Sequence, residues 1–394
     1  MRGHRASLAS ISPPTLPLTP GVGFCRLLCF FALALLARAA LADPALGLPR
    51  VSALSGQTAA EIELGRKLFM DRRLSRNGTM SCGMCHIPEQ GFAANEMATA
   101  IGMQGRSLRR NAPTLLNVVF QRTLFHDGRS DSLESQVWGP LLAPDEMGNL
   151  TRTAVVARVS TLPDYSAPFE RAFPQHGATE QTIAAALASY ERTLIAADSR
   201  FDRWFLGGGA SALSSSERAG FDLFTGKAGC SVCHTVGADS ALFTDHGFHN
   251  SGVGWLHAST DDRRISVPLG GGETAEVSVA EMTALFGGGT HDDGRFEVTH
   301  EASDRWAYKT PSLRNVALTA PYMHDGSLAT LSDVIDFYDR GGIDNPGKDP
   351  LLRPLHLTAE EKQQLAAFLL TLTSDQAGRL AAEARAAFHS RKPD

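Results

Sequence analysis

The chain has 394 residues, which is enough for about two globular domains. Its 37 basic and 42 acidic residues give a formal net charge of −5 at pH 7, and this acidic balance disfavours a nucleic acid as the partner. Four arginines and no acidic residue lie in the first 42 residues, so the remaining chain carries −9, which is compatible with docking a basic protein.

The first 42 residues have the pattern of a secretory signal peptide. Arginines precede an apolar run over 27–36, and Ala40-Leu41-Ala42 follows as an A-x-A cleavage site. The apolar run is too short to cross a bilayer. Cleavage after Ala42 removes Cys25 and Cys29 and leaves 352 of the 394 residues, with no cysteine free for a disulfide. We therefore predict export to the periplasm; an uncleaved anchor is the alternative.

Two copies of one short motif hold every remaining cysteine. Cys-x-x-Cys-His is the attachment signature of c-type haem, in which the thiols bond to the haem vinyl groups and the histidine ligates the iron. A redox dithiol and half of a four-cysteine zinc site are alternatives, but neither explains the histidine after each pair. The sequence therefore predicts two c-type haems, held by Cys82, Cys85 and His86 and by Cys230, Cys233 and His234.

The surroundings of the two motifs also repeat. A helix with a capping box, a glycine and a Leu-Phe pair precedes each motif, over 58–69 and over 214–224. After each motif, a Pro-[Ser/Thr]-Leu-x-Asn-Val stretch (113–118 and 311–316) is followed by His-Asp-Gly, thirteen residues beyond its proline. The chain is therefore a tandem duplication of one haem-binding unit.

The remaining segments define the expected fold. Helical apolar periods cover 179–204 and 357–372, and glycines and serines break the pattern at 203–214. The stretch 236–305 is polar and Gly-rich, which is typical of long loops and a short hairpin. We predict a mainly α fold with two tandem cytochrome c-type domains. The signal peptide is expected over 1–42, the first domain over 43–205 and the second over 206–394.

The duplication indicates that the two haem sites differ. Fourteen residues after His324, the second copy has Tyr338, whereas the same count from His126 in the first copy reaches Pro140. Tyr338 follows the apolar face of a helix that begins after Thr330, so it points towards the domain interior. A phenolate there would ligate iron and stabilise high oxidation states; a buried core tyrosine is the alternative.

Proline has no side-chain atom that binds iron, so Pro140 predicts an open position on the first haem, where peroxide can bind. Gln136 and Glu146 flank this proline. A carboxylate beside bound peroxide can take its proton and return it to the leaving oxygen. Glu146 is the candidate for this role, although both polar residues are equally compatible with a solvated surface.

Together these motifs resemble the bacterial dihaem cytochrome c peroxidase and MauG superfamily. The resemblance covers roughly residues 55 to 375. Besides the two haem motifs, it rests on the stretches 110–113, 126–129, 136–147, 294–296, 309–315 and 319–326. It implies two c-type haems, hydrogen peroxide as substrate and a redox partner protein.

The resemblance also implies individual roles. His86 and His234 are the expected proximal ligands, of a peroxide-reactive haem and an electron-transfer haem respectively. Glu146 is the expected acid–base residue, with Gln136 and Pro140 shaping its pocket. Tyr338 resembles the MauG branch, because the ordinary peroxidases have methionine at that place; this branch oxidises tryptophans of a partner protein.

A calcium ion between the domains is a further implication of the resemblance. Asn111 and the backbone carbonyls of Thr319 and Pro321 are its expected ligands. Oxygen donors of this kind suit a hard cation.

The chain departs from the family pattern at several positions. His126 stands where relatives commonly have a tryptophan relay; we expect a structural hydrogen-bond donor there, with a role near the haem as the alternative. The loop 101–105 lacks the histidine that blocks the distal site in some relatives, and Met103 is either a soft ligand or a loop residue. We interpret four scattered histidines as loop residues rather than as ligands of a third metal site: His246, His249, His257 and His291.

The leading hypothesis is a periplasmic, peroxide-dependent dihaem oxidoreductase. Its electron-donating partner is a small cytochrome or cupredoxin in the peroxidase case, or a protein with oxidisable tryptophans in the MauG-like case. A non-enzymatic dihaem electron carrier is the alternative, and Pro140 with Glu146 argues against it. The ligand at position 338 does not by itself specify the partner.

Overall fold

The computed structural model describes residues 45–50, 56–105, 107–260, 264–270, 273–278 and 292–389. The predicted signal peptide over 1–42 and His291 lie outside these residues. The structure is mainly helical, as predicted, and its two halves belong to one compact unit that begins at Ala45. None of the helices in the described part of the chain has the length and hydrophobicity needed to span a lipid bilayer.

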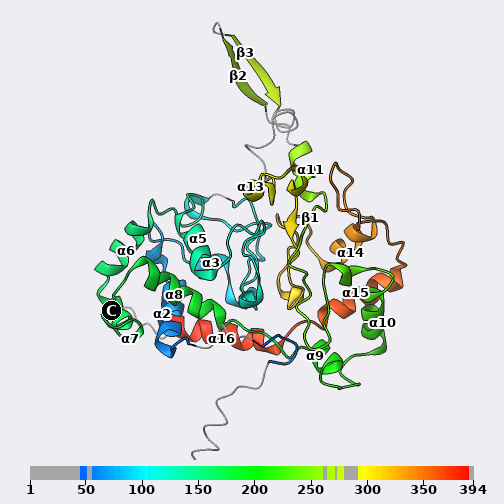
Figure 1. Ribbon diagram of the computed structural model, residues 1–394, viewed down its shortest axis with the longest axis horizontal. Coiled ribbons are helices and arrows are strands. Elements are labelled where there is room, and N and C mark those ends of the chain that lie inside the picture. Colours follow the sequence, from blue (N-terminus) through cyan, green and yellow to red (C-terminus); the bar gives the residue numbers. More distant parts are fainter. Residues whose placement is uncertain are drawn as a thin grey trace, which may run out of the picture. The chain divides into compact units, whose positions relative to one another are not determined.

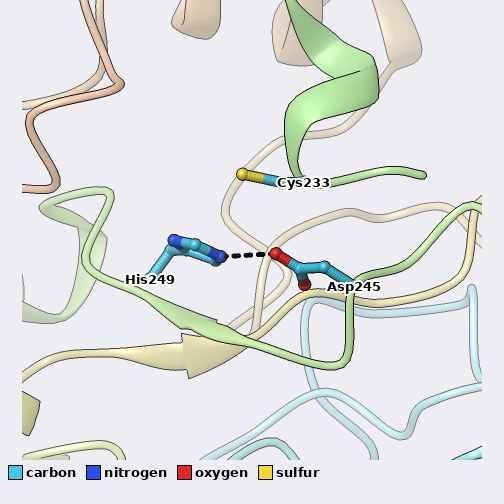
Figure 2. Close-up of side chains that lie close together, drawn as sticks. All are labelled: Cys233, Asp245 and His249. Carbon is cyan, nitrogen blue, oxygen red and sulfur yellow. Dashed lines mark hydrogen bonds and ion pairs between the residues drawn. The ribbon is translucent and has the colours of Figure 1, made fainter.

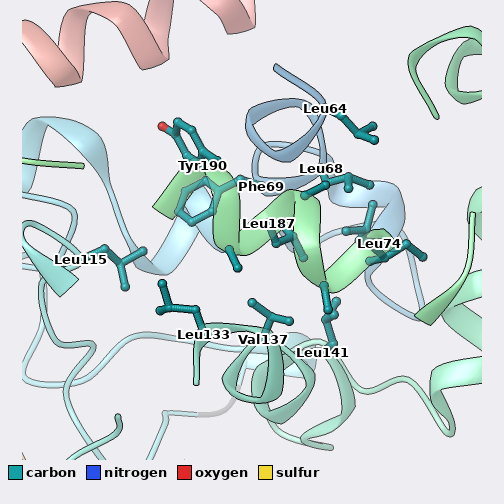
Figure 3. Close-up of a cluster of buried hydrophobic side chains, with 14 of the residues drawn as sticks. Leu64, Leu68, Phe69, Leu74, Leu115, Leu133, Val137, Leu141, Leu187 and Tyr190 are labelled. Atoms are coloured by element: carbon teal, nitrogen blue, oxygen red, sulfur yellow. The ribbon is translucent and has the colours of Figure 1, made fainter. Parts of the chain in front are cut away.

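The helices of the first half surround one hydrophobic core. Figure 3 shows its centre, where α8 (Glu180–Arg192) lies between the leucines of α2 (Ala59–Phe69) on one side and the short helices α4 (Leu133–Gln136) and α5 (Trp138–Leu142) on the other. The described residues of this half form seven helices: α2, α4, α5 and α8 together with α3 (Cys82–Cys85), α6 (Arg152–Thr161) and α7 (Pro163–Ala172).

A second core lies in the other half and is rich in phenylalanine. Phe201, Phe224, Phe243 and Phe368 are almost completely buried there, with the ring centroids of Phe201 and Phe243 5.1 Å apart. The helices from this part of the chain are α9 (Arg200–Phe205), α10 (Ser215–Thr225), α11 (Val253–Thr260), α13 (Phe296–Thr299), α14 (Leu331–Asp339), α15 (Ala359–Leu370) and α16 (Asp375–His389).

Only short strands occur in the described chain. The polar stretch 236–305 contains the expected hairpin, in which β2 (Arg264–Gly270) and β3 (Glu273–Ser278) pair antiparallel. A second antiparallel pair joins β1 (Phe248–His249) to β4 (Tyr308–Lys309), with Phe248 opposite Lys309. The sequence did not predict this pair, because two-residue strands carry no periodic signal.

The duplication is visible in how the helices pack. In each half, the helix before the haem motif lies side by side with a later helix: α2 with α8 and α10 with α15 (Figure 1). A glycine permits each close approach. A Cβ atom at Gly65 would lie 1.8 Å from the carbonyl oxygen of Ala186, and one at Gly220 would lie 2.0 Å from that of Gln364.

The loops after the motifs are anchored to these helix pairs in matching ways. Asn117 and Asn315 both adopt left-handed backbone conformations, with φ of 62° and 61°. The Asn117 N–H donates to the carbonyl of Leu194, just beyond α8, at 2.7 Å; the Asn315 N–H donates to that of Leu372, just beyond α15, at 3.0 Å.

The last helix crosses back to the first half. Ala377 and Ala384 of α16, drawn in red in Figure 1, are buried in the first core, and Arg385 forms an ion pair with Glu89 just after the first haem motif. The first half is therefore completed by residues from the C-terminal end of the chain.

Gly65 and Gly220 allow the paired helices to approach closely, so replacing either glycine by alanine should destabilise the protein. The added methyl group of Gly65→Ala or Gly220→Ala meets backbone, which cannot move aside like a flexible side chain, so we expect a loss of roughly 1–3 kcal/mol in the free energy of unfolding. Gly378→Ala is the control, because its Cβ meets nothing within 4 Å on an exposed part of α16; it should be neutral or stabilising by roughly 0.5–1 kcal/mol. Denaturant unfolding measures all three, and crossing variants as stable as the control would contradict the tight approach.

Candidate haem and peroxide site

One large cavity joins the two haem motifs. Its volume is about 1180 Å³, above the roughly 300–1000 Å³ that is usual for a pocket holding one small ligand. Its lining comes from both halves of the chain and is largely apolar, with leucines from the loops after each motif. Among the lining residues are Cys85, His86, Cys230, Cys233 and His234.

The structure orients the first motif histidine for metal binding. His86 lies at the C-terminal end of α3, and its Nδ1 is 3.1 Å from the carbonyl oxygen of Phe92. Because a carbonyl only accepts hydrogen bonds, Nδ1 carries the proton, which leaves the lone pair of Nε2 for a metal. Phe92 reaches this position through a left-handed backbone conformation, with φ of 55°.

The second motif repeats this arrangement. His234 Nδ1 lies 2.9 Å from the carbonyl oxygen of Phe243, whose φ is 53°. Burial lowers the pKa of both His86 and His234, which keeps each imidazole in its neutral form, the form that binds iron. Both histidines therefore fit the role of a proximal haem ligand.

The cysteines fit haem attachment better than thiol chemistry. Burial raises the pKa of Cys85 to about 11 and that of Cys230 to about 12, so their thiols stay protonated at neutral pH. A redox-active dithiol needs a lowered pKa. The surroundings of these cysteines thus argue against the redox-dithiol alternative.

Cys233, Asp245 and His249 come together beside the second motif (Figure 2). Both ring nitrogens of His249 already have carboxylate partners, since Nε2 lies 3.0 Å from Asp245 and Nδ1 lies 2.5 Å from Asp349. Cys233, and then the two carboxylates, raise the pKa of His249 to about 10. Both ring nitrogens of His249 are therefore occupied by hydrogen bonds within the chain. His257 likewise pairs with Asp325.

The three residues predicted for the peroxide pocket all line the cavity. Gln136 ends α4, Pro140 lies in α5, and Glu146 follows in the next loop. Burial, and then the neighbouring Asp145 carboxylate, raise the pKa of Glu146 to about 7, while Arg129 opposes the shift. Glu146 can therefore exchange a proton near neutral pH.

The loop that contains Gly102 and Met103 packs against the backbone at Glu146. The N–H of Met103 donates to the carbonyl of Glu146 at 3.0 Å, and a Cβ atom at Gly102 would lie only 1.7 Å from the carbonyl oxygen of Asp145. Met103 is buried in the first core and does not line the cavity. Met103 therefore supports the backbone at Glu146 and does not face the cavity as a ligand would. The sequence did not predict this contact, because Met103 and Glu146 lie about 40 positions apart.

Tyr338 lies at the other end of the cavity. It shares the cavity-facing side of α14 with Leu331, Val334 and Ile335, as the helical spacing predicted. Burial, and then the nearby Cys230 and Cys233, raise its pKa to about 12. A metal cation at the phenol oxygen would reverse this preference and favour the phenolate.

His126 is a hydrogen-bond donor at the junction of the halves. Its Nε2 lies 2.9 Å from the carbonyl oxygen of Asn111, and burial lowers its pKa to about 4. Next to it, the rings of Tyr308 and His324 stack with centroids 3.6 Å apart. No local pattern predicts this stack, because the two residues lie 16 positions apart in the chain.

Asn111 has the surroundings expected of a cation ligand. Its Nδ2 donates to the carbonyl of Pro321 at 2.7 Å, while its Oδ1 is buried without a hydrogen-bond partner among the described residues. Thr319 and Pro321 both line the cavity. A buried amide oxygen without a partner, on a side chain that contacts the Pro321 carbonyl, fits a ligand of a calcium ion.

Comparisons with known proteins agree with this class of site. Residues 59–210 match the family model "Di-haem cytochrome c peroxidase". The chain is 38% identical to the methylamine utilization protein MauG of Methylorubrum extorquens, over 81% of this chain and 80% of that protein. It is 32% identical to the cytochrome c551 peroxidase of Nitrosomonas europaea, over 83% and 84% respectively.

Solved structures give the same result. A MauG-like protein associated with microbial copper homeostasis superposes with a TM-score of 0.68 at 33% identity, covering 85% of this chain and 96% of that one. The fold is thus that of the dihaem peroxidases and MauG-like proteins. The chain belongs to the di-haem cytochrome c peroxidase family, which includes MauG, and is a peroxide-dependent oxidoreductase.

Proposed function

We propose that this protein is a periplasmic enzyme that consumes hydrogen peroxide at the haem of His86 and draws electrons through the haem of His234 from a partner protein. Residues 1–42 direct export, 43–205 carry the first haem and 206–394 the second. The observation that carries the proposal is the contrast between the two ends of the cavity. Pro140 and Glu146 line the cavity, with Glu146 close to Cys85 of the first motif, whereas Tyr338 lines it close to Cys230 and Cys233 of the second.

At the first end, the chain's own residues are suited to proton transfer. The haem supplies the iron centre that binds peroxide and cleaves its O–O bond. The Glu146 carboxylate accepts the proton of the incoming peroxide and returns it to the departing oxygen, which leaves as water. Pro140 offers no competing ligand, and the Gln136 amide lies in the same lining, where it can hydrogen-bond to peroxide.

At the second end, His234 and Tyr338 are the proposed ligands of the electron-transfer haem. His234 offers a neutral Nε2, and Tyr338 offers an oxygen that ionises when it meets iron(III). A haem held by both residues would have no free position for peroxide.

The partner is a redox protein that supplies electrons. A small cytochrome or cupredoxin would make this chain a peroxidase, and a protein with oxidisable tryptophans would make its activity MauG-like. The net charge of −9 outside the first 42 residues favours a basic docking surface on either kind of partner. The similarity to both MauG and cytochrome c551 peroxidase supports the general class.

Replacing Glu146 by Gln should slow the reaction with peroxide by roughly 10²–10⁴-fold, because the amide cannot accept a proton. In the unchanged protein, the rate should rise as pH increases through about 7, since the carboxylate is the proton-accepting form. Stopped-flow recording of the Soret band after mixing with peroxide measures both effects.

Asp145→Asn supplies the matched control for Glu146. Removing the neighbouring negative charge should lower the pKa of Glu146 and move the pH profile to lower pH without the large loss of rate. An unchanged rate in Glu146→Gln would remove Glu146 from the proton-transfer role.

Replacing Tyr338 by Met should change the low-spin haem signal in the electron paramagnetic resonance spectrum, because a thioether replaces a phenolate on the iron. Tyr322→Phe is the control: Tyr322 also lines the cavity, but its hydroxyl donates to the carbonyl of Val316 at 3.1 Å. An identical spectrum in Tyr338→Met would identify Tyr338 as a core residue.

We also propose that Asn111, Thr319 and Pro321 hold a calcium ion at the junction of the halves. Chelation should lower the melting temperature, since a ligand of the folded state stabilises it by mass action, and added calcium should restore it. Asn111→Ala should abolish the effect of the chelator. A melting temperature that is indifferent to chelation in the native protein would refute the site.

A further inference from the structure

Lys309 connects the two halves of the protein at the cavity. It ends β4, and its backbone N–H donates to the carbonyl of His126 at 2.8 Å. Its ammonium group donates to the carbonyl of Thr123. Lys309 is one of the residues that line the cavity between the two haem motifs.

The neighbouring cations are neutralised by carboxylates, and Lys309 is not. Arg110 pairs with Asp127 and Asp292 at 2.5 Å each, and Arg129 pairs with Asp127 at 2.7 Å. The Asp127 carboxylate near Lys309 is thus already shared by two guanidinium groups. Within the described residues, Lys309 has only a neutral carbonyl as side-chain partner.

This environment is costly for an ammonium ion. Burial lowers the pKa of Lys309 to about 8, and the electrostatic attraction of the Asp127 carboxylate offsets only part of this shift. A buried charge is normally paired, because desolvation outweighs what neutral hydrogen bonds return. The ammonium group of Lys309 therefore lacks an anionic partner, and the described residues do not supply one.

Haem brings such an anion, since each haem carries two propionate carboxylates. We propose that Lys309 binds a propionate of one of the two haems and thereby fixes that cofactor at the junction of the halves. This inference rests on the family's two haems and is independent of the roles of Glu146 and Tyr338. Lys309 also places a positive charge beside that haem, which favours the reduced iron and raises its reduction potential.

The test is a spectroelectrochemical titration of the holoprotein and its variants. Lys309→Met should lower the midpoint potential of one haem and leave the other nearly unchanged, while Lys309→Arg should keep both close to the original values. Intact mass establishes that both haems remain attached. Should Lys309→Met fail to accumulate, Lys309→Gln is measured in the same way. Unchanged midpoints in the neutral variant would overturn the proposal.

Lys227→Met is the matched control, because Lys227 also lines the cavity but already pairs with Glu361 at 2.7 Å. It should leave both potentials unchanged, and an equal shift in this variant would show a non-specific effect of charge. A second arm adds acetate at constant ionic strength. If the Lys309 ammonium is already bound to a propionate, acetate should leave the midpoint potentials unchanged. A midpoint potential that depends on acetate, and loses this dependence in Lys309→Met, would show that Lys309 binds free anions and would overturn the proposal.

Discussion

The hydrogen bond from Nδ1 of each motif histidine to a phenylalanine carbonyl determines what the rest of the structure can do. It fixes the tautomer of His86 and His234, so that Nε2 faces the cavity as a neutral ligand. Each carbonyl is placed by a left-handed residue, Phe92 or Phe243, that is itself completely buried. The hydrophobic cores therefore do more than stabilise the fold, because they hold the acceptors that orient the metal ligands.

The same duplicated scaffold produces two different ends of one cavity. The glycine crossings and the asparagine anchors are nearly identical in the two halves, and this conserves the position of the motif relative to its helix pair. The difference lies on the opposite wall. There one copy presents Pro140 with a carboxyl whose pKa is near neutrality, and the other presents a buried phenol from α14. The duplication thus repeats the scaffold around each motif histidine, and the two halves differ in the few residues that line the cavity at Pro140, Glu146 and Tyr338.

Charge at the junction of the halves couples these two ends. Arg110 bridges Asp127 of the first half to Asp292 of the second, and β4 follows the first-half backbone at His126. These contacts are buried, so solvent screens them little. They bring Lys309, a partly buried lysine with no carboxylate partner among the described residues, to the wall of the cavity, where an anionic cofactor can complete the network.

The sequence by itself determined the features that are local in the chain. Capping boxes, the Cys-x-x-Cys-His motifs and the repeat of His-Asp-Gly are set by near neighbours, and they sufficed to predict a mainly helical fold and the family. The face of α14 that carries Tyr338 follows from the helical period alone. The roles of Glu146, Tyr338 and the calcium ligands remain predictions, since geometry makes them suitable without testing them.

Tertiary structure decided what depends on residues far apart in sequence. The raised pKa of Glu146 arises from burial in the folded chain, and its support by Gly102 and Met103 requires two loops to meet. The orphaned oxygen of Asn111, the return of α16 to the first core and the isolation of Lys309 likewise depend on which groups become neighbours. A sequence specifies residue types and local periods, whereas desolvation and pairing are properties of the packed chain.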